Sequence, residues 1–268
     1  MSTTIATFNV NSVRSRLPIL EKWLSSPSAP DILCLQELKC QDGEFPEDFF
    51  AALGYQSRYK GMKSYNGVAV VSKFAPDEAA FGLGDGAAAP EKEESELARV
   101  ARVRFGELNI VNTYIPQGKE LDNPDYPYKL AFIGRVRAMF ERDYKPTDKV
   151  LWVGDLNVAP TDIDVTNPKT KKGHVCFHED VKKALADAMA WGMEDVFRKH
   201  LPEEGNFTFW DYRVKDSLNR NIGWRIDHIL ATKPLAALSQ SVKVERELRA
   251  MERPSDHTAV TAMFDLSL

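Results

Sequence analysis

The stretch DKVLWVGDLNVAPTDIDV, residues 148–165, sets the expectation for both the fold and the site. Its apolar run from Val150 to Val153 ends at a glycine, which is typical of a strand buried on both faces. An acid, Asp155, and an amide, Asn157, follow at once. Because ligands of α/β proteins gather beyond the carboxyl ends of such strands, these side chains stand where chemistry is expected. If the chain stays extended between them, both project to the same side and could share one ligand.

Length and composition indicate an ordinary globular protein. The chain has 268 residues, 43% of them hydrophobic and 28% charged, which is enough to bury a full core within one domain spanning 1–268. The N-terminal segment lacks the basic flank and apolar core of a signal peptide, and no apolar run approaches the roughly 20 residues that cross a bilayer. We therefore expect a cytoplasmic monomer with no membrane association.

Charge and cysteine content narrow the class of partner. The three cysteines are odd in number and match no paired zinc spacing, so they fit a reducing compartment better than a disulfide framework. Cys34 is expected in the core. A formal net charge of −4 argues against a general nucleic-acid coating protein. Any phosphate-binding face must therefore be local.

Apolar runs that predict strands recur along the whole chain, with helical periodicity between some of them. Gly106 joins two of these strands by a short turn, which predicts antiparallel pairing there. The segment from Gly82 to Glu96 is rich in Gly and Ala and then acidic, which predicts a solvated surface loop. The predicted strands cover residues 3–10, 31–37, 67–73, 98–105, 108–115, 149–155, 225–232 and 257–264, and the predicted helices cover 17–24, 46–53, 127–140 and 179–191. The pattern predicts sheets covered by helices.

Polar residues that suit metal chemistry stand at the ends of several predicted strands. Each alone has an ordinary explanation, because turns and strand ends collect such residues. Together they would bury several acids near one another, which is costly without a cation. They are Asn9, Asn11, Glu37, Asp155, Asn157, Asp227, Asp256 and His257. Oxygen ligands with a single histidine favour Mg²⁺ or Mn²⁺ over zinc, and Mg²⁺ commonly completes its shell with substrate phosphate.

Seven short motifs lie in order over nearly the whole chain. They are FNVNSVRSR (8–16), LQELK (35–39), NGVAVVSK (66–73), NTYIPQG (112–118), GDLNVAPTDID (154–164), GWRIDHIL (223–230) and PSDHTAV (254–260). Together they resemble the exonuclease III family of abasic-site endonucleases, within the endonuclease, exonuclease and phosphatase superfamily. GDLN and SDH alone also fit the wider superfamily, but the set of seven is highly specific. The resemblance implies an α/β fold, a four-layered α/β sandwich of two mixed, mainly antiparallel β-sheets packed face to face with helices outside.

The resemblance also implies a metal site that takes Mg²⁺, with Mn²⁺ as a substitute. Glu37 would be the principal ligand, and Asp256 and the turn at Asn9 and Asn11 would contribute directly or through water. Some family members carry an aspartate where this chain has Asn11, and a neutral amide binds a cation more weakly. The implied metal-site residues are Asn9, Glu37, Asp155, Asn157, Asp256 and His257.

Catalytic roles follow from the same resemblance. Asp155 would activate the attacking water as a general base, while Asn157 and Tyr114 would contact the scissile phosphate. Asp227 would orient His257 and favour its charged imidazolium, which offsets charge on the five-coordinate phosphate. The implied catalytic residues are Tyr114, Asp155, Asn157, Asp227 and His257.

Basic clusters, each more often a solvated surface when taken alone, could supply backbone contacts to duplex DNA. The resemblance marks three apolar residues as walls of a pocket for a flipped-out abasic sugar, too small for a normal nucleotide. By composition alone such aromatics would be core, which is where we expect Trp210. The expected DNA-binding residues are Arg14, Lys63, Asn167, Lys169, Phe209, Trp224 and Ile226.

Three functions are compatible with these features. The resemblance implies a Mg²⁺-dependent DNA-repair phosphodiesterase that cleaves double-stranded DNA 5′ to abasic sites, with 3′–5′ exonuclease and 3′ end-cleaning activity. The alternative is a phosphatase or phosphodiesterase with the same core, acting on a small-molecule or lipid phosphate. A third reading is an inert DNA-binding or scaffold protein, against which the complete polar set argues.

Overall fold

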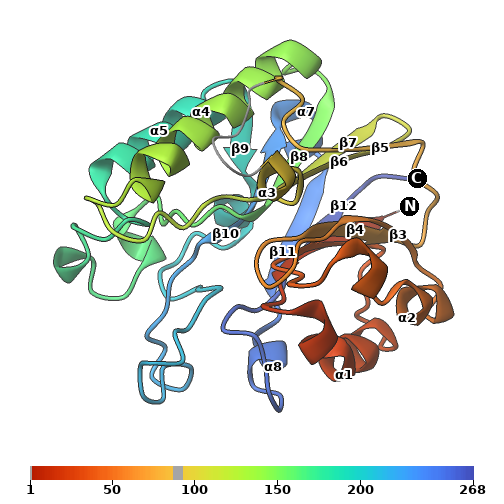
Figure 1. Ribbon diagram of the computed structural model, residues 1–268, viewed down its shortest axis with the longest axis horizontal. Coiled ribbons are helices and arrows are strands. Elements are labelled where there is room, and N and C mark those ends of the chain that lie inside the picture. Colours follow the sequence, from red (N-terminus) through yellow and green to blue (C-terminus); the bar gives the residue numbers. More distant parts are fainter. Residues whose placement is uncertain (1, 87–92) are drawn as a thin grey trace.

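Two six-stranded β-sheets pack face to face, with helices on their outer faces (Figure 1). The computed structural model describes residues 2–86 and 93–268. The first sheet contains β1 (Thr3–Asn9), β2 (Ile32–Gln36), β3 (Gln56–Lys60), β4 (Val68–Ser72), β11 (Ser239–Val244) and β12 (Val260–Phe264). Their order is β11-β12-β1-β2-β4-β3, in which β1 and β2 run parallel and the other neighbours antiparallel.

The second sheet repeats this arrangement. It contains β5 (Glu78–Phe81), β6 (Val100–Phe105), β7 (Leu108–Tyr114), β8 (Lys149–Asp155), β9 (Met193–Asp195) and β10 (Asp227–Thr232). Their order is β5-β6-β7-β8-β10-β9, with β7 and β8 parallel and the other neighbours antiparallel. The antiparallel pairing across Gly106 is as predicted.

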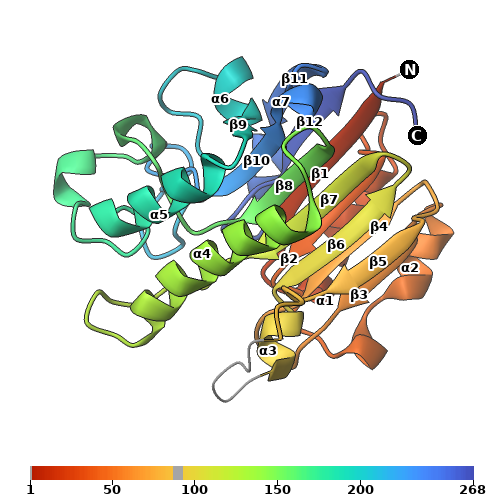
Figure 2. The same ribbon diagram turned by 90° about the horizontal axis from the view of Figure 1, so that it is seen from above.

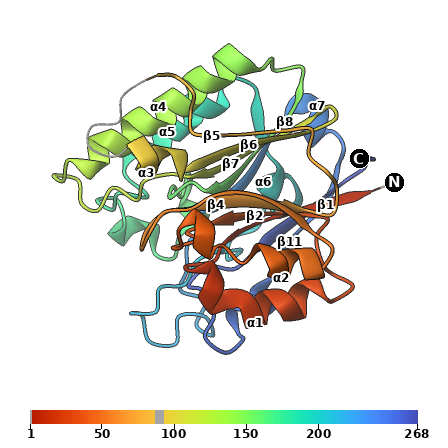
Figure 3. The ribbon, with the colours of Figure 1, turned by 45° about the vertical axis from the view of Figure 1, so that its right-hand side comes forward.

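Helices form the two outer layers. They are α1 (Val13–Leu24), α2 (Glu47–Ala52), α3 (Glu93–Leu97), α4 (Asp125–Asp143), α5 (Glu179–Met189), α6 (Val196–His200), α7 (Lys233–Ala236) and α8 (Arg246–Arg249). Short 3₁₀ turns are η1 (Asp42–Glu44), η2 (Asp162–Asp164) and η3 (Pro168–Thr170). Figure 3 shows α1 and α2 outside the first sheet and α4 and α5 outside the second. The predicted four-layered sandwich is confirmed.

Three apolar layers hold these four layers together. The central one lies between the sheets and joins Ile5 of β1 to Val153 of β8. One outer layer packs Trp152 against Phe140 of α4, and the other packs Phe8 of β1 against α1 and α2. Each fully buried side chain of this size stabilises the fold by about 1.5–3 kcal/mol. In the part of the chain that the structure describes, no helix combines the length and apolarity needed to cross a membrane.

All eight predicted strands form, and four further strands escaped prediction: β3, β5, β9 and β11. These four are the edge strands of the two sheets. Their side chains are largely exposed or half-buried, as in β5, where three of the four residues are exposed. An edge strand that is open to solvent needs no apolar run, so its sequence carries a weak strand signal.

The four predicted helices also form, with shifted ends. The largest shift is in α1, which begins at Val13 instead of Leu17. The backbone N–H groups of Ser12 and Val13 donate to the carbonyl oxygens of Glu37 and Leu38, respectively. Contacts with the segment after β2 therefore fix the start of this helix, and local periodicity does not report such contacts.

The solvated loop predicted from Gly82 to Glu96 is wrong at its C-terminal end. Residues 87–92 of this segment lie outside the described residues. Glu96, however, belongs to α3 and is 6% exposed. Its carboxylate accepts hydrogen bonds from Arg135 at 2.7 and 2.9 Å and from the Tyr128 hydroxyl at 2.8 Å. These hydrogen bonds from α4 offset the cost of burying the carboxylate of Glu96.

The strand directions show which end of the sandwich can hold the site. The two chain termini lie side by side at the opposite end, where Thr3 pairs with Phe264 (Figure 2). At the end of the sandwich away from the termini, β1, β2, β7 and β8 all end and β10 begins. Residues that follow these strands are therefore brought together, as the sequence indicated.

A buried polar network lies under this end of the second sheet. Arg225 donates to Asp164 at 2.6 Å and pairs with Asp195 at 2.8 Å. His228, 0% exposed, donates from Nε2 to the carbonyl oxygen of Val158 at 2.7 Å, and its Nδ1 accepts from Arg225 at 3.2 Å. Both ring nitrogens are thus satisfied in the neutral form. Burial, followed by the charge of Arg225, lowers the pKa of His228 to about 4.

This histidine should make the protein less stable in mild acid. Below pH 6.5, the ordinary pKa of histidine, His228 is protonated in the unfolded chain but stays neutral in the folded protein. The free energy of unfolding therefore falls as the pH drops from about 6.5 toward 4. Between pH 7 and pH 5 the expected loss from this group is on the order of 2 kcal/mol. Urea denaturation at both pH values should show a smaller loss in His228→Gln. A loss equal to that of the wild type would contradict this account. His178→Gln, at a half-exposed histidine outside this network, serves as the control.

Candidate active site

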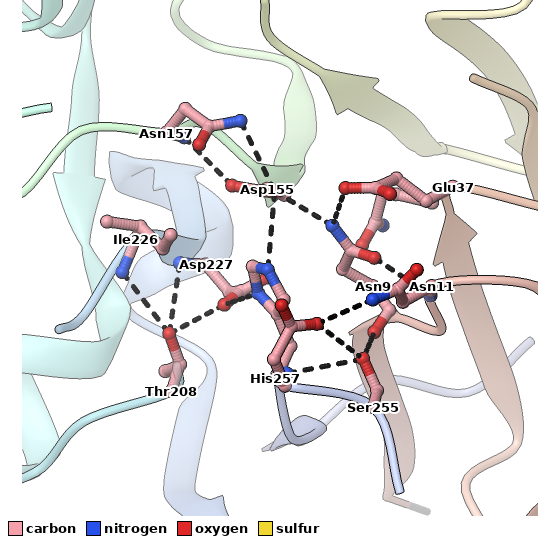
Figure 4. Close-up of polar contacts among 12 residues, drawn as sticks. Asn9, Asn11, Glu37, Asp155, Asn157, Thr208, Ile226, Asp227, Ser255 and His257 are labelled. Carbon is pink, nitrogen blue, oxygen red and sulfur yellow. Dashed lines mark hydrogen bonds and ion pairs between the residues drawn. The ribbon is translucent and has the colours of Figure 1, made fainter. Parts of the chain in front are cut away.

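Side chains from several strand ends meet in one cluster (Figure 4). The antiparallel pairing of β8 and β10 sets Asp155 directly opposite Asp227. These two acids are 1% and 0% exposed, respectively. Asn9 closes β1, Glu37 follows β2, and His257 lies in the segment before β12. The fold therefore brings together residues from both sheets that are distant in the sequence.

Asp155 and Asn157 contact each other directly, although β8 ends at Asp155 and does not continue between them. Asn157 has a left-handed backbone with φ 52°. Its main-chain N–H donates to Asp155 Oδ1 at 2.9 Å, and its side-chain amide donates to Asp155 Oδ2 at 3.3 Å. Gly154 allows β7 to approach, because a Cβ there would lie 1.9 Å from the carbonyl oxygen of Thr113. The two polar residues still face one site.

Asn9 connects the acids of the two sheets. Its side-chain amide donates to Glu37 Oε1 at 2.8 Å and to Asp155 Oδ2 at 2.9 Å. Its side-chain oxygen, Oδ1, accepts from the backbone N–H of Asn11 at 3.0 Å. Asn9 is 0% exposed and is therefore a buried support for the two carboxylates.

His257 lies between Asp227 and Asp155. Its Nδ1 is 2.8 Å from Asp227 Oδ2, and its Nε2 is 3.8 Å from Asp155 Oδ2. Thr208 donates to the same oxygen of Asp227 at 2.6 Å. Burial opposes a charge on the imidazole, but the two carboxylates prevail and raise the pKa of His257 well above its ordinary value. The ring is therefore an imidazolium at neutral pH.

Burial also opposes the charged form of Asp155, but for an acid this shifts the pKa upward, while the charge of His257 acts to lower it. A carboxylate with a raised pKa is a stronger base than one in water. For Tyr114, at the end of β7, desolvation and the nearby carboxylates of Glu37 and Asp155 raise the pKa well above 10. This phenol therefore stays a hydroxyl donor at neutral pH.

The cluster can hold a metal ion. Glu37, Asp155 and His257 each offer a ligand atom, and these atoms lie within 4.8 Å of one another. Burial acts against the charge of Glu37, but Lys39 and Asn9 hold its pKa below the usual value, so the group is anionic. Oδ1 of Asp227 is buried with no hydrogen-bond partner among the described residues. These carboxylate oxygens fit a hard divalent cation, whereas the charged ring of His257 makes this side chain a poor ligand.

Asn11 and Asp256 lie beside this cluster and contact each other. The side-chain amide of Asn11 donates to Asp256 Oδ1 at 2.9 Å. Its side-chain oxygen, Oδ1, accepts from Lys39 Nζ at 2.6 Å, and Lys39 also pairs with Glu37 at 2.8 Å. Both polar groups of Asn11 are thus engaged within the protein, in keeping with the doubt that the sequence raised about this residue as a metal ligand.

A cleft of about 940 Å³ opens over the cluster. Nine residues expected at the site line it: Glu37, Tyr114, Asp155, Asn157, Phe209, Trp224, Ile226, Asp256 and His257. Two more, Asn9 and Asp227, are fully buried and contact this set from behind. Sequence reasoning therefore located the cleft and nine of the residues that line it. Trp210, expected in the core, is 1% exposed, and Cys34 is 0% exposed.

Four predicted DNA-binding residues lie outside the cleft lining: Arg14, Lys63, Asn167 and Lys169. Arg14, on α1, pairs with Glu44 at 3.2 Å. Asn167 has φ 56° and precedes η3, which contains Lys169, while Lys63 lies between β3 and β4.

The cleft also has lining residues that the sequence did not reveal: Gln117, Thr166, His174, Cys176 and Arg213. The His174 ring lies 4.6 Å from the Trp224 ring, and Cys176 donates its backbone N–H to His174 Nδ1 at 3.1 Å. Burial, followed by nearby cations, lowers the pKa of His174 to about 4, so this ring is neutral. All five come from connecting segments that show no periodicity, and of the five only Gln117 lies within one of the seven motifs.

Comparisons with known proteins agree with this geometry. A model of the endonuclease/exonuclease/phosphatase family matches residues 6–257. Exodeoxyribonuclease III of Haemophilus influenzae is 32% identical over 269 residues, covering 96% of this chain and 98% of that protein. The solved structure of an AP endonuclease from Archaeoglobus fulgidus has a TM-score of 0.93 at 42% identity, covering 98% of this chain and 100% of that one.

A second structural relative is the 3′–5′ exonuclease of Neisseria meningitidis, with a TM-score of 0.88 at 35% identity and coverage of 98% of this chain and 100% of that one. A Neisseria structure with the same similarity is a 3′ phosphatase bound to a product DNA hairpin. The chain belongs to the endonuclease/exonuclease/phosphatase family, as the seven motifs indicated.

Removing one anionic oxygen should weaken the cation site. We expect Glu37→Gln to bind Mg²⁺ or Mn²⁺ at least about tenfold more weakly, a scale that loss of even an outer-shell partner can reach. Isothermal titration of the folded variants with each ion measures this change. Glu47→Gln, at an exposed position of α2, is the matched control and should bind as the wild type does. Equal affinity in Glu37→Gln would remove this residue from the metal site.

Proposed function

We propose that this chain is a Mg²⁺-dependent DNA-repair phosphodiesterase that cleaves the backbone of double-stranded DNA 5′ to abasic sites. We further propose 3′–5′ exonuclease and 3′ end-cleaning activity, with Mn²⁺ able to replace Mg²⁺, in a monomer with one domain spanning 1–268. The observation that carries the proposal is the buried Asp227–His257–Asp155 series beside Glu37 in one cleft. The named activities of the similar exonucleases and AP endonucleases support it.

The carboxylate and amide oxygens fit a magnesium ion. Glu37 would be its main protein ligand, with Asp256 and Asn9 beside it and water completing the shell. When bound, the ion supplies charge stabilisation for the leaving 3′ oxygen. We leave His257 out of the ligand set, because its ring is held as an imidazolium between two carboxylates.

Asp155 would act as the general base. Its carboxylate is buried and faces the cleft, and two donors from Asn157 and one from Asn9 hold it in place. A water molecule next to it could give up a proton as the oxygen attacks phosphorus. The raised pKa makes this carboxylate a better proton acceptor, since general-base efficiency follows basicity.

Three donors would receive the phosphate. The Nε2–H of His257 carries positive charge toward the cleft, and Tyr114 keeps its hydroxyl proton. The side-chain amide of Asn157 would add a neutral donor by turning to the phosphate the N–H that donates to Asp155 at 3.3 Å, while its other N–H stays on the carbonyl oxygen of Ile115. Donors that are fixed before the reaction stabilise charge as it develops on the five-coordinate phosphate. Asp227 would serve by orienting His257.

Phe209, Trp224 and Ile226 would form the pocket for the extruded abasic sugar. They line the cleft together, and Phe209 lies 4.8 Å from the ring of His257. An apolar wall next to the phosphate donors would place a sugar beside the scissile bond. Arg14, Lys63, Asn167 and Lys169 would contact the DNA backbone on either side, which suits recognition by shape and charge.

The alternative is a phosphatase or phosphodiesterase that acts on a small-molecule or lipid phosphate with the same residues. The product length from an end-labelled duplex with one abasic site separates the two readings. We expect one cut immediately 5′ to the abasic site with Mg²⁺ and none with EDTA. An intact duplex under conditions that release phosphate from a small ester would overturn the proposal.

Loss of the base should remove turnover and leave binding intact. Asp155→Asn should fold and bind DNA but lose on the order of 10²–10⁴ in rate, the usual contribution of a positioned base. His257→Ala should also be severe. Because both residues act on one transition state, the loss in the double variant should be smaller than the product of the single losses. Strict multiplicativity would show that they serve separate steps.

The preference for abasic over undamaged DNA should depend on the apolar wall formed by Phe209, Trp224 and Ile226. Phe209→Ala or Trp224→Ala should lower cleavage at the abasic site while cutting at undamaged positions falls less or rises. The loss should stay below about 1–3 kcal/mol, the scale of an aromatic stacking contact with a base. Trp210→Phe, a change in the core, is the control and should not alter the ratio of abasic to undamaged cutting. An unchanged ratio with a lowered melting temperature in the wall variants would remove them from the recognition site.

A further inference from the structure

A lysine lies fully buried behind the cleft. Lys129, on α4, is 0% exposed, and none of the ion pairs among the described residues involves it. Lysines are almost never fully buried without an acidic partner, because an ammonium loses its hydration there. Burial accordingly lowers the pKa of Lys129 below its ordinary value of 10.5. A group so costly to bury needs a reason beyond packing.

Three backbone carbonyls take the place of an acid. Lys129 Nζ donates to the oxygens of Asn157 at 2.7 Å, Val175 at 2.9 Å and Gln117 at 3.1 Å. An ammonium has three N–H donors, so this set uses all of them. The three acceptors belong to separate segments: the connection between β7 and α4, the turn after β8, and the connection that leads to α5. One side chain thus joins three loops.

These loops carry the reacting groups. The residue that Lys129 holds most closely, Asn157, donates its backbone N–H to Asp155 and its side-chain amide to both Asp155 and the carbonyl oxygen of Ile115. The segment at Val175 is tied to the same turn, because the N–H of Ala159 donates to the carbonyl oxygen of Cys176 at 2.7 Å. Movement of the Asn157 carbonyl would therefore move the donors that hold Asp155.

We propose that Lys129 is a positioning residue, which fixes the turn from Asp155 to Asn157 and joins it to the cleft wall at residues 174–176. It does not touch substrate, since it lies behind the lining of the cleft. Its role in turnover rests on the proposed function. Misplacement of a catalytic group by about 1 Å can cost 10²-fold in rate, so a support of this kind acts mainly on kcat.

The test is Lys129→Met, which keeps the length and apolar stem and removes the three donors. With abasic duplex and Mg²⁺, we expect kcat per folded molecule to fall about 10- to 100-fold while KM changes less than about threefold. Lys149→Met, at the opposite end of β8, is the matched control and should retain both constants. Val136→Ala, in the apolar face of α4, should lower the melting temperature and leave kcat unchanged at temperatures where it is folded. If Lys129→Met does not fold, Lys129→Gln takes its place with the same expectations.

Hydrogen exchange measures the same role without turnover. In Lys129→Met, peptides that cover residues 155–159 and 174–177 should exchange faster, whereas those of β1 and β12 should not change. Unchanged exchange there, or a kcat equal to that of Val136→Ala, would overturn the proposal. Failure of the wild type to cut abasic DNA would reject the proposed function alone, because the exchange result would still report on Lys129.

Discussion

The pairing of β8 with β10 sets Asp155 directly opposite Asp227, and both acids are almost fully buried beside the cleft. The other residues of the site compensate for this placement. Like charges opposite each other on neighbouring strands repel, and burial strengthens the repulsion. The imidazole of His257 lies between the two acids and is kept protonated by them. Donors from Asn9, Asn157 and Thr208 satisfy most of the remaining carboxylate oxygens. The arrangement is stable only because positive charge and donors converge on it.

The same placement connects stability with chemistry. The burial of Asp155 at the cleft raises its pKa, so it accepts a proton more readily than a carboxylate in water, while its imidazolium neighbour presents a donor to the cleft. Glu37, anionic through Lys39 and Asn9, adds a ligand for a cation on the other side. Lys119, Lys171 and Arg213 line the cleft together with five acids, so a bound cation would be needed to offset the acids beside a phosphate. A phosphodiester fits such a site better than a neutral substrate would.

Much of the fold and of the site could be predicted from the sequence, and the features that were missed have physical causes. The buried strands and the residues after them were evident, because an apolar run followed by Asp155 or Glu37 is a local signal. The edge strands were not, since β5 and β11 face solvent and carry no such run. Asn157 reaches Asp155 through a left-handed turn that alternation could not show. Lys129 and His174 act through contacts across the fold, so nothing near them in the sequence marks them.

The substrate class is tested most directly by measuring the turnover of two kinds of phosphate ester by the same enzyme preparation. An abasic duplex and a mixture of inositol phosphates should be compared under identical Mg²⁺ concentrations, each with an EDTA control. We expect kcat/KM for the duplex to be higher by several orders of magnitude and activity on both substrates to be abolished by EDTA. In the proposed function, the duplex alone would use the apolar wall together with the backbone contacts. Comparable values for the two substrates, or a higher value for the inositol phosphates, would contradict it.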